Sequence, residues 1–315
     1  MINTIVVPLD GSRFAEQALE PAHYLARRLG AAVEVVQVFE PGVELPYVSG
    51  APPLDTRLDA EVRAGALTYV SGVAERERQA GVVMKAELLD GPVVQTLAAH
   101  VAALDHPLVV MTTHGRSGLG RLLGSVTDAL VRSAAAPVLA IRATKENDAP
   151  TTTRFGRVLV PIAGADFDAD IGERSADIFG NDVEYILLHA ISPVPFILRP
   201  EPTVIPPVID LDAEEEVARN LLDVLASDLR ARGAHVRTRI VIDVDPAHAI
   251  LTGVKEADAD TISMATHGYR GIKRLVLGSV ADTVLHNAPL PVLLVRPPEA
   301  AELTDDEAAG RAAAR

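Results

Sequence analysis

Cysteine and tryptophan are both absent from this chain, and aromatic residues make up only 3% of its 315 positions. Without cysteine there can be no disulfide, no thiolate zinc site and no iron–sulfur cluster, which agrees with a reducing cytoplasm. No apolar run approaches the roughly 18 residues that a membrane span needs. The first residues show no basic region followed by an apolar stretch, so we expect no signal peptide. We therefore expect a cytoplasmic protein with no membrane partner.

Positive charge is also scarce, because 29 Lys and Arg residues face 43 Asp and Glu residues, for a net charge of −14 at pH 7. A surface this acidic repels a nucleic-acid backbone, so we expect no nucleic-acid partner. A local basic patch can still serve a small anionic ligand. The length suggests about two domains, with cores built from Ala, Val, Leu and Ile.

The two halves of the chain repeat each other. The motif Met111–Gly115 reappears as Met264–Gly268, and the triplet Gly124–Val126 reappears as Gly278–Val280, in both cases about 153 residues later. A period this long indicates a duplicated domain, because solenoid repeats are about 20–50 residues long. We predict one domain over residues 1–145 and a second over 155–298, joined by a polar linker at 143–156. The tail at 299–315 has no apolar face, and we expect it to be disordered.

Each half alternates strands and helices. In the first half we expect strands at Thr4–Leu9, Val33–Phe39, Val82–Leu88, Leu108–Thr112 and Val138–Ile141, and helices at Phe14–Leu29, Leu58–Gln79, Val93–Ala103 and Val126–Ser133. In the second half we expect strands at Val158–Pro161, Val183–Ile191, His235–Ile242, Thr261–Ala265 and Val292–Val295, with helices at Glu173–Phe179, Ala213–Arg232, Ala247–Glu256 and Val280–His286. This alternation predicts an α/β fold of two tandem doubly wound domains, Rossmann-like or flavodoxin-like, each with a five-stranded parallel sheet.

A glycine-rich segment follows the fourth strand of the first half. Glycines let a backbone approach an anion closely, and four occur here: Gly115, Gly118, Gly120 and Gly124. Ser125 and Ser279 then open helices whose first N–H groups carry partial positive charge, which predicts a phosphate cradle. It is not a Walker loop, because neither half contains Gly-Lys-Ser/Thr. An alternative stays open, in which Ser125 with Asp128, and Ser279 with Asp282, cap their helices without any ligand.

Together these motifs resemble the universal stress protein family in its tandem form. The resemblance rests on Met-x-x-His-Gly, Gly-Ser-Val, the Pro-Val-Leu of the last strands and the opening Val-Val-Pro-Leu-Asp-Gly-Ser, and it covers the chain except linker and tail. It implies that the chain binds ATP or a related adenine nucleotide, with Mg²⁺ bound through the phosphates. It also implies an intramolecular pseudo-dimer in which Val138–Ile141 meets Val292–Val295. Protein partners are unknown, and a homodimer of the whole chain is compatible with the sequence.

The resemblance also implies which residues line the two sites. In the first half the nucleotide-binding positions are Pro8, Leu9, Asp10, Val38, Met111, Thr112, Gly115, Gly118, Gly124, Ser125, Val126 and Thr127. The second, weaker site comprises Ile162, Ala190, Met264, Ala265, Gly268, Gly278, Ser279 and Val280.

Neither half matches the family pattern in full. Nucleotide-binding members carry Gly-x2-Gly-x9-Gly-Ser/Thr, but Thr112 and Ala265 stand where the first glycine belongs. Eight residues separate Gly115 from Gly124, whereas the second half keeps the nine-residue spacing.

An acid at the end of the first strand completes the family pattern, and only the first half has it. Ala163 replaces Asp10 in the second half, and Ala281 replaces Thr127, which removes a hydroxyl from the phosphate end. Losing one hydrogen bond to the nucleoside costs about 1–3 kcal/mol. We therefore expect the first half to bind nucleotide better.

Three functions compete at this point. The leading one is a nucleotide-binding stress-response protein with no turnover or a very slow ATPase activity. The second is a nucleotide-free scaffold for protein contacts. The third is a hydrolase of ATP or another phosphate ester, but no paired carboxylates, catalytic lysine or nucleophile–base pair lies near the loop in the sequence. We therefore predict no catalytic residues and no metal site.

Overall fold

The computed structural model describes residues 2–41, 56–79, 81–113, 124–134, 136–143, 155–164, 170–194, 209–266 and 277–296. The predicted tail at 299–315 and most of the predicted linker lie outside the described residues. Among the residues that are described, no helix combines the length and apolarity needed to cross a membrane.

Strands and helices alternate in both halves, as the apolar periodicity predicts. The first half contains β1 (Thr4–Leu9), α1 (Arg13–Glu16), α2 (Leu19–Leu29), β2 (Ala32–Phe39), α3 (Thr56–Gln79), β3 (Met84–Asp90), α4 (Val93–Ala103), β4 (Pro107–Thr112), α5 (Ser125–Ser133) and β5 (Val138–Ile141). The second half contains β6 (Arg157–Pro161), α7 (Ile171–Phe179), β7 (Glu184–Ile191), α8 (Leu211–Ala231), β8 (His235–Ile242), α9 (Pro246–Glu256), β9 (Thr261–Ala265), α10 (Ser279–Asn287) and β10 (Val292–Val295).

The single helix expected over Phe14–Leu29 is divided into α1 and α2. Pro21 is the third residue of α2, and it has no N–H to donate to the carbonyl of Gln17 four residues earlier. Its ring also crowds that carbonyl, so the helix restarts after Ala18. Apolar side chains at helical spacing are nevertheless buried along both pieces, at Ala15, Ala18, Leu19, Ala22, Leu25 and Ala26.

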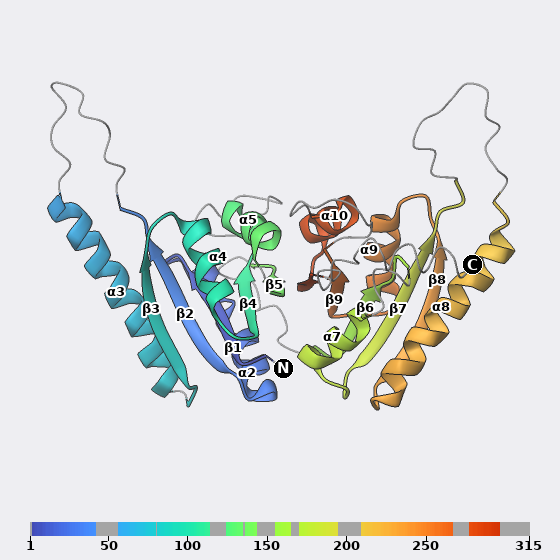
Figure 1. The fold of residues 1–315 in the computed structure, drawn as a ribbon, viewed down its shortest axis with the longest axis horizontal. Coiled ribbons are helices and arrows are strands. Elements are labelled where there is room, and N and C mark those ends of the chain that lie inside the picture. Colours follow the sequence, from blue (N-terminus) through green and yellow to red (C-terminus); the bar gives the residue numbers. More distant parts are fainter. Residues whose placement is uncertain are drawn as a thin grey trace, which may run out of the picture.

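The strands of both halves form one ten-stranded sheet in the order β3-β2-β1-β4-β5-β10-β9-β6-β7-β8 (Figure 1). Pairing is parallel within each half, and β5 and β10 pair antiparallel with Leu139 opposite Leu293. The predicted α/β fold class, and the predicted meeting of the last strands in a pseudo-dimer, are confirmed. Figure 1 shows α3 and α8 at the two outer flanks and α5 and α10 at the centre.

Helices cover both faces of this sheet. Apolar residues of α2, α3, α7 and α8 form one core with one face, and those of α4, α5, α9 and α10 form a second core with the other. Successive residues of β5 alternate between them, with Leu139 in the first and Ala140 in the second. Each core contains residues from both halves, so the hydrophobic packing continues across the junction.

Phe155 joins the two halves on the first of these faces, although it lies in the predicted linker range. Its side chain is 1% exposed, and its ring centroid lies 5.5 Å from that of Tyr24 on α2 and 5.0 Å from that of Phe179 on α7. Asp260 Oδ2 accepts hydrogen bonds from two successive backbone N–H groups, beginning at Gly156, at 2.8 and 3.0 Å. These contacts fix the chain where it enters β6.

Candidate functional site

The order of strands reverses at β1. From β1 the chain moves outward through β2 to β3, then returns to β4 on the other side of β1 and continues to β5. In a parallel sheet wound this way, ligands bind beyond the carboxyl ends of the two strands at the reversal. In the first half these are the ends of β1 and β4, which we call the first crevice. The second half repeats the arrangement with β6 and β9, the second crevice.

Asp10 follows β1 directly and is oriented by the turn that leads into α1. Its Oδ1 accepts hydrogen bonds from the backbone N–H of Ser12 at 2.9 Å and from the Ser12 hydroxyl at 2.6 Å. Gly11 has a φ of 84°, in the left-handed region that favours glycine. Ser12 Oγ also accepts from the Ala15 N–H at 3.2 Å, as the N-cap of α1. The sequence identified Asp10, but the orienting role of Ser12 emerges only from the structure.

Two hydrogen bonds tie the start of α5 to the end of β4. The backbone N–H of Gly124 donates to the carbonyl of Thr113 at 2.6 Å. The buried hydroxyl of Thr127 donates to the carbonyl of Thr112 at 2.9 Å. Phosphate oxygens only accept hydrogen bonds, and the Thr127 proton is already donated to the backbone. This arrangement favours a positioning role for Thr127 over the phosphate contact expected from the sequence.

In each half, the helix that follows the end of the fourth strand has a glycine as its N-cap. Gly124 is the N-cap of α5 and Gly278 is the N-cap of α10, and neither helix start, as far as the chain is described, has a side-chain capping bond. Ser125 and Ser279 are exposed first residues of their helices. The alternative in which these serines cap the helices is therefore wrong. Uncapped N–H groups beside an exposed hydroxyl form an arrangement that binds anions.

The other predicted positions of the first crevice lie at different depths. Leu9 and Met111 are buried, each in one of the two cores. Pro8, Val38 and Val126 are half-buried.

The second crevice has the same backbone frame without the acid. The N–H of Gly278 donates to the carbonyl of Thr266 at 2.8 Å, as Gly124 does to Thr113 in the first half. Ala163 is exposed at the end of β6, and buried Ala281 supplies no hydroxyl to the end of β9.

Its remaining predicted positions repeat those of the first crevice. Ile162 and Met264 are buried, whereas Ala190, Ala265 and Val280 are half-buried. The predicted Gly115, Gly118 and Gly268 lie outside the described residues.

A model of the universal stress protein family matches the chain twice, over residues 1–142 and 154–296. The chain belongs to the universal stress protein family. One universal stress protein of Mycobacterium tuberculosis is 28% identical over 313 residues, which cover 94% of this chain and 95% of that relative. Another from the same species is 28% identical over 243 residues, or 75% of this chain and 76% of that protein.

The fold is shared with a solved universal stress protein from Archaeoglobus fulgidus. The TM-score is 0.64 at 19% sequence identity, and the match covers 94% of this chain and 96% of that one. At this identity the likeness shows the fold alone.

In the described part of this universal stress protein, one group of side chains has the geometry to hold a metal ion. The ligand atoms of Glu34, Glu87 and His100 lie within 4.8 Å of one another. Lys85 Nζ already contacts Glu87 at 2.6 Å and Glu34 at 2.9 Å. These bonds raise the pKa of the Lys85 amine, and the bond from Lys85 lowers the pKa of the Glu87 carboxyl. The Lys85 ammonium thus already pairs with the two carboxylates that a metal ion would need.

This ion-pair network is remote from the first crevice. Glu34 lies near the amino end of β2, whereas the crevice lies beyond the carboxyl ends of the strands. We assign the network no part in ligand binding.

Proposed function

We propose that this universal stress protein binds an adenine nucleotide, ATP or a close relative, in its first crevice. The observation that carries the proposal is an oriented carboxylate and an uncapped helix start at one reversal of strand order. Asp10 follows β1, and Gly124–Thr127 begins beside the end of β4. A carboxylate accepts hydrogen bonds from a ribose hydroxyl or an adenine amino group, and the helix N–H groups receive phosphate oxygens.

The first crevice is the better candidate of the two. Ala163 offers no acceptor where Asp10 stands, and Ala165 replaces Ser12, the residue that orients the acid. One lost hydrogen bond costs about 1–3 kcal/mol, which is roughly fivefold to 150-fold in Kd. The second crevice therefore binds the same ligand more weakly.

We propose that the chain acts by binding the nucleotide and not by hydrolysing it. Phosphoryl transfer needs a group that orients water and acidic ligands that hold Mg²⁺. The described residues at the end of β4 and the start of α5 supply backbone N–H groups and hydroxyls, and the one acid among them, Asp128, is paired with Arg132. Mg²⁺ would be bound through the nucleotide phosphates, and occupancy would change the shape of the chain or its choice of protein partner.

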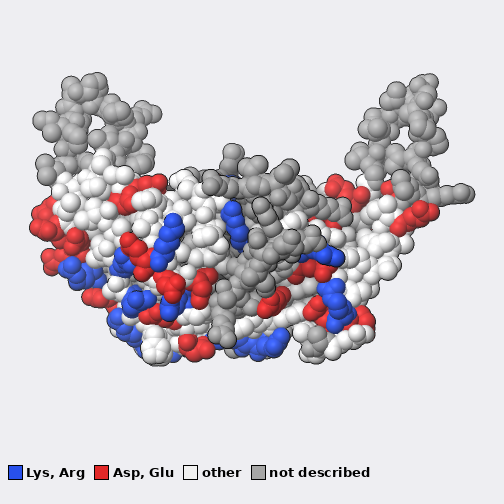
Figure 2. Space-filling model, turned by 180° about the vertical axis from the view of Figure 1, so that it is seen from behind, with Lys and Arg blue, Asp and Glu red and all other residues white. Residues whose placement is uncertain are grey.

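The surface charge supports a small ligand over a nucleic acid. On the face shown in Figure 2, the acidic and basic side chains of the described residues are interleaved and build no broad basic surface. The cytoplasmic location and a homodimer of the whole chain remain predictions.

Calorimetric titration of the full chain with ATP tests the proposal. Asp10→Ala should weaken binding by about 1–3 kcal/mol because it removes an acceptor for the nucleoside. Ala163→Asp should leave the first crevice unchanged and serves as a control. Unchanged affinity in Asp10→Ala, together with loss of binding in Gly268→Val, would place the ligand in the second half.

A phosphate-release assay with ATP and Mg²⁺ tests the lack of turnover. We expect release to be far below about 1 per second, the lower end of ordinary enzyme rates. Sustained hydrolysis at that rate, abolished by Gly124→Val, would show that the chain is an enzyme.

A further inference from the structure

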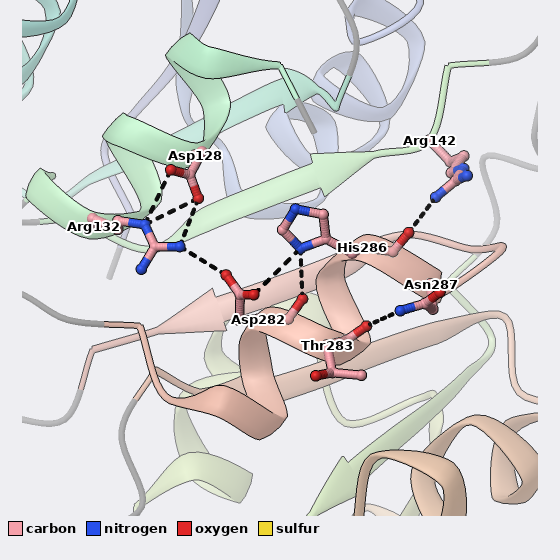
Figure 3. A network of polar contacts seen from close by, with 7 residues as sticks. All are labelled: Asp128, Arg132, Arg142, Asp282, Thr283, His286 and Asn287. Carbon is pink, nitrogen blue, oxygen red and sulfur yellow. Dashed lines mark hydrogen bonds and ion pairs between the residues drawn. The ribbon is translucent and has the colours of Figure 1, made fainter. Parts of the chain in front are cut away.

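The two helices that begin at the crevices are bonded to each other across the junction. Arg132, near the end of α5, donates from Nε to both carboxylate oxygens of Asp128 at 3.0 and 3.1 Å. Its Nη2 donates to Asp282 Oδ1 of α10 at 2.7 Å (Figure 3). One guanidinium therefore bridges two acids, one from each half of the chain.

Both acids occupy the same place in their helices. The Asp128 N–H donates to the carbonyl of Gly124 at 2.9 Å, and the Asp282 N–H donates to that of Gly278 at 2.8 Å. Each acid thus belongs to the first turn of its helix, whose free N–H groups the proposed function assigns to the phosphates. A carboxylate in this position repels an anionic ligand, and the positive charge of Arg132 offsets that repulsion for both helices.

The bridge is not symmetric. His286 holds the place in α10 that Arg132 holds in α5, and its Nδ1 lies 2.8 Å from the carbonyl oxygen of Asp282 in its own helix. Asp282 Oδ2 is 3.7 Å from the same nitrogen. In the described part of the chain, the cation of the ion pair between α5 and α10 is thus Arg132, which belongs to the first half.

The far ends of the two helices are held reciprocally. Arg142, which follows β5, donates to the carbonyl of His286 at 3.1 Å (Figure 3) and to that of Ala288 at 3.4 Å, at the end of α10. Arg296, which follows β10, donates to the carbonyl of Arg132 near the end of α5 at 3.2 Å. Cations are favourable at the carboxyl ends of helices. Each half therefore positions the helix that serves the other half's crevice.

We propose that Arg132 is a positioning residue that couples the two crevices, so that the anion affinity of one half depends on a charge in the other. The inference rests on the proposed function for its ligand, because it assumes that nucleotide phosphates meet the starts of α5 and α10. It predicts that substitutions in the second half change binding in the first crevice, although they touch no ligand there.

Calorimetry with ATP on full-length variants tests the coupling. Arg132→Gln should weaken binding about threefold to tenfold at low salt, because two uncompensated carboxylates then remain near the phosphates. Asp282→Asn, in the second half, should tighten binding in the first crevice about twofold to fivefold, because it removes a negative charge. Mere loss of structure would weaken binding instead. Asp223→Asn, an exposed acid of α8, is the matched control and should change nothing.

Salt and a double variant separate electrostatic coupling from other causes. Both effects should nearly vanish at about 0.5 M salt, where charges are screened within a few ångströms. In the double variant that combines Arg132→Gln with Asp282→Asn, the two changes in ATP affinity should not add, because the two residues share one interaction. Unchanged or weaker binding in Asp282→Asn, or additive effects in the double variant, would overturn the proposal.

A ligand-free measurement distinguishes failure of the coupling from failure of the proposed function. Hydrogen exchange of the α10 amides should be faster in Arg132→Gln than in the wild type or in Arg219→Gln, whose arginine pairs with Glu215 of its own helix. If the wild type binds no ATP, the proposed function is wrong, and this exchange still decides whether Arg132 couples the helices. Equal α10 exchange in all three proteins would show that it does not.

Discussion

Replacement of Phe155 tests whether the two halves share the core that α2, α3, α7 and α8 form with the sheet. The side chain is 1% exposed and contacts an aromatic ring from each half, Tyr24 and Phe179. Truncation of a buried phenylalanine to alanine costs about 3–5 kcal/mol. Each aromatic pair contributes about 0.5–1.5 kcal/mol beyond the buried area. We expect Phe155→Ala to lower the free energy of unfolding by about 4 kcal/mol, a large share of the 5–15 kcal/mol typical of a domain.

Urea unfolding followed by circular dichroism measures this loss. Phe155→Leu keeps an apolar side chain but loses both ring contacts, so it should cost about 1–2 kcal/mol. Val217→Ala on α8 is the control, because its side chain is 65% exposed and its loss should cost less than about 0.5 kcal/mol. A loss below about 1 kcal/mol in Phe155→Ala would refute the shared core and leave Phe155 as an ordinary linker residue.

Two further predictions concern stability. Burial lowers the pKa of His23, whose Nε2 has no hydrogen-bond partner among the described residues. The unfolded chain therefore binds a proton at His23 more readily than the folded chain does. The contribution of neutral His23 to the free energy of unfolding is complete above about pH 6.5 and is lost as the pH falls below it. His23→Gln should flatten the fall in unfolding free energy between pH 7.5 and 5.5, and an unaltered pH profile would contradict this. Gly30 and Gly180 both end helices with positive φ, but a Cβ at Gly180 would collide with the Arg28 guanidinium, whereas Gly30 has open space. In thermal unfolding, Gly30→Ala should cost about 1–2 kcal/mol for the backbone alone and Gly180→Ala clearly more; equal losses would show that Arg28 moves away freely.

Apolar periodicity predicted the order of strands and helices because it records burial directly. The buried face of α2 and the four-residue strands β5 and β10 follow from it. Pro21, by contrast, interrupts a pattern that remains helical on both sides, so the periodicity alone did not reveal the break before α2.

Details of the candidate site were harder to predict, because they depend on which group is nearest in space. Ser125 with Asp128 satisfies the sequence pattern of a capping box, yet Gly124 is the N-cap and Asp128 pairs with Arg132. The bond from Arg132 to Asp282 joins residues 150 positions apart, and no local pattern signals it. The duplication offered one clue, since both helices carry an acid followed four residues later by a basic or histidine side chain.

Native mass spectrometry with added ATP tests nucleotide binding by the first crevice most directly. The wild-type chain should acquire one ATP adduct at ligand concentrations where Asp10→Ala acquires much less. Ala163→Asp should retain at least the same adduct. Absence of any adduct on the wild type, or an adduct of the same abundance on Asp10→Ala, would contradict the proposed function.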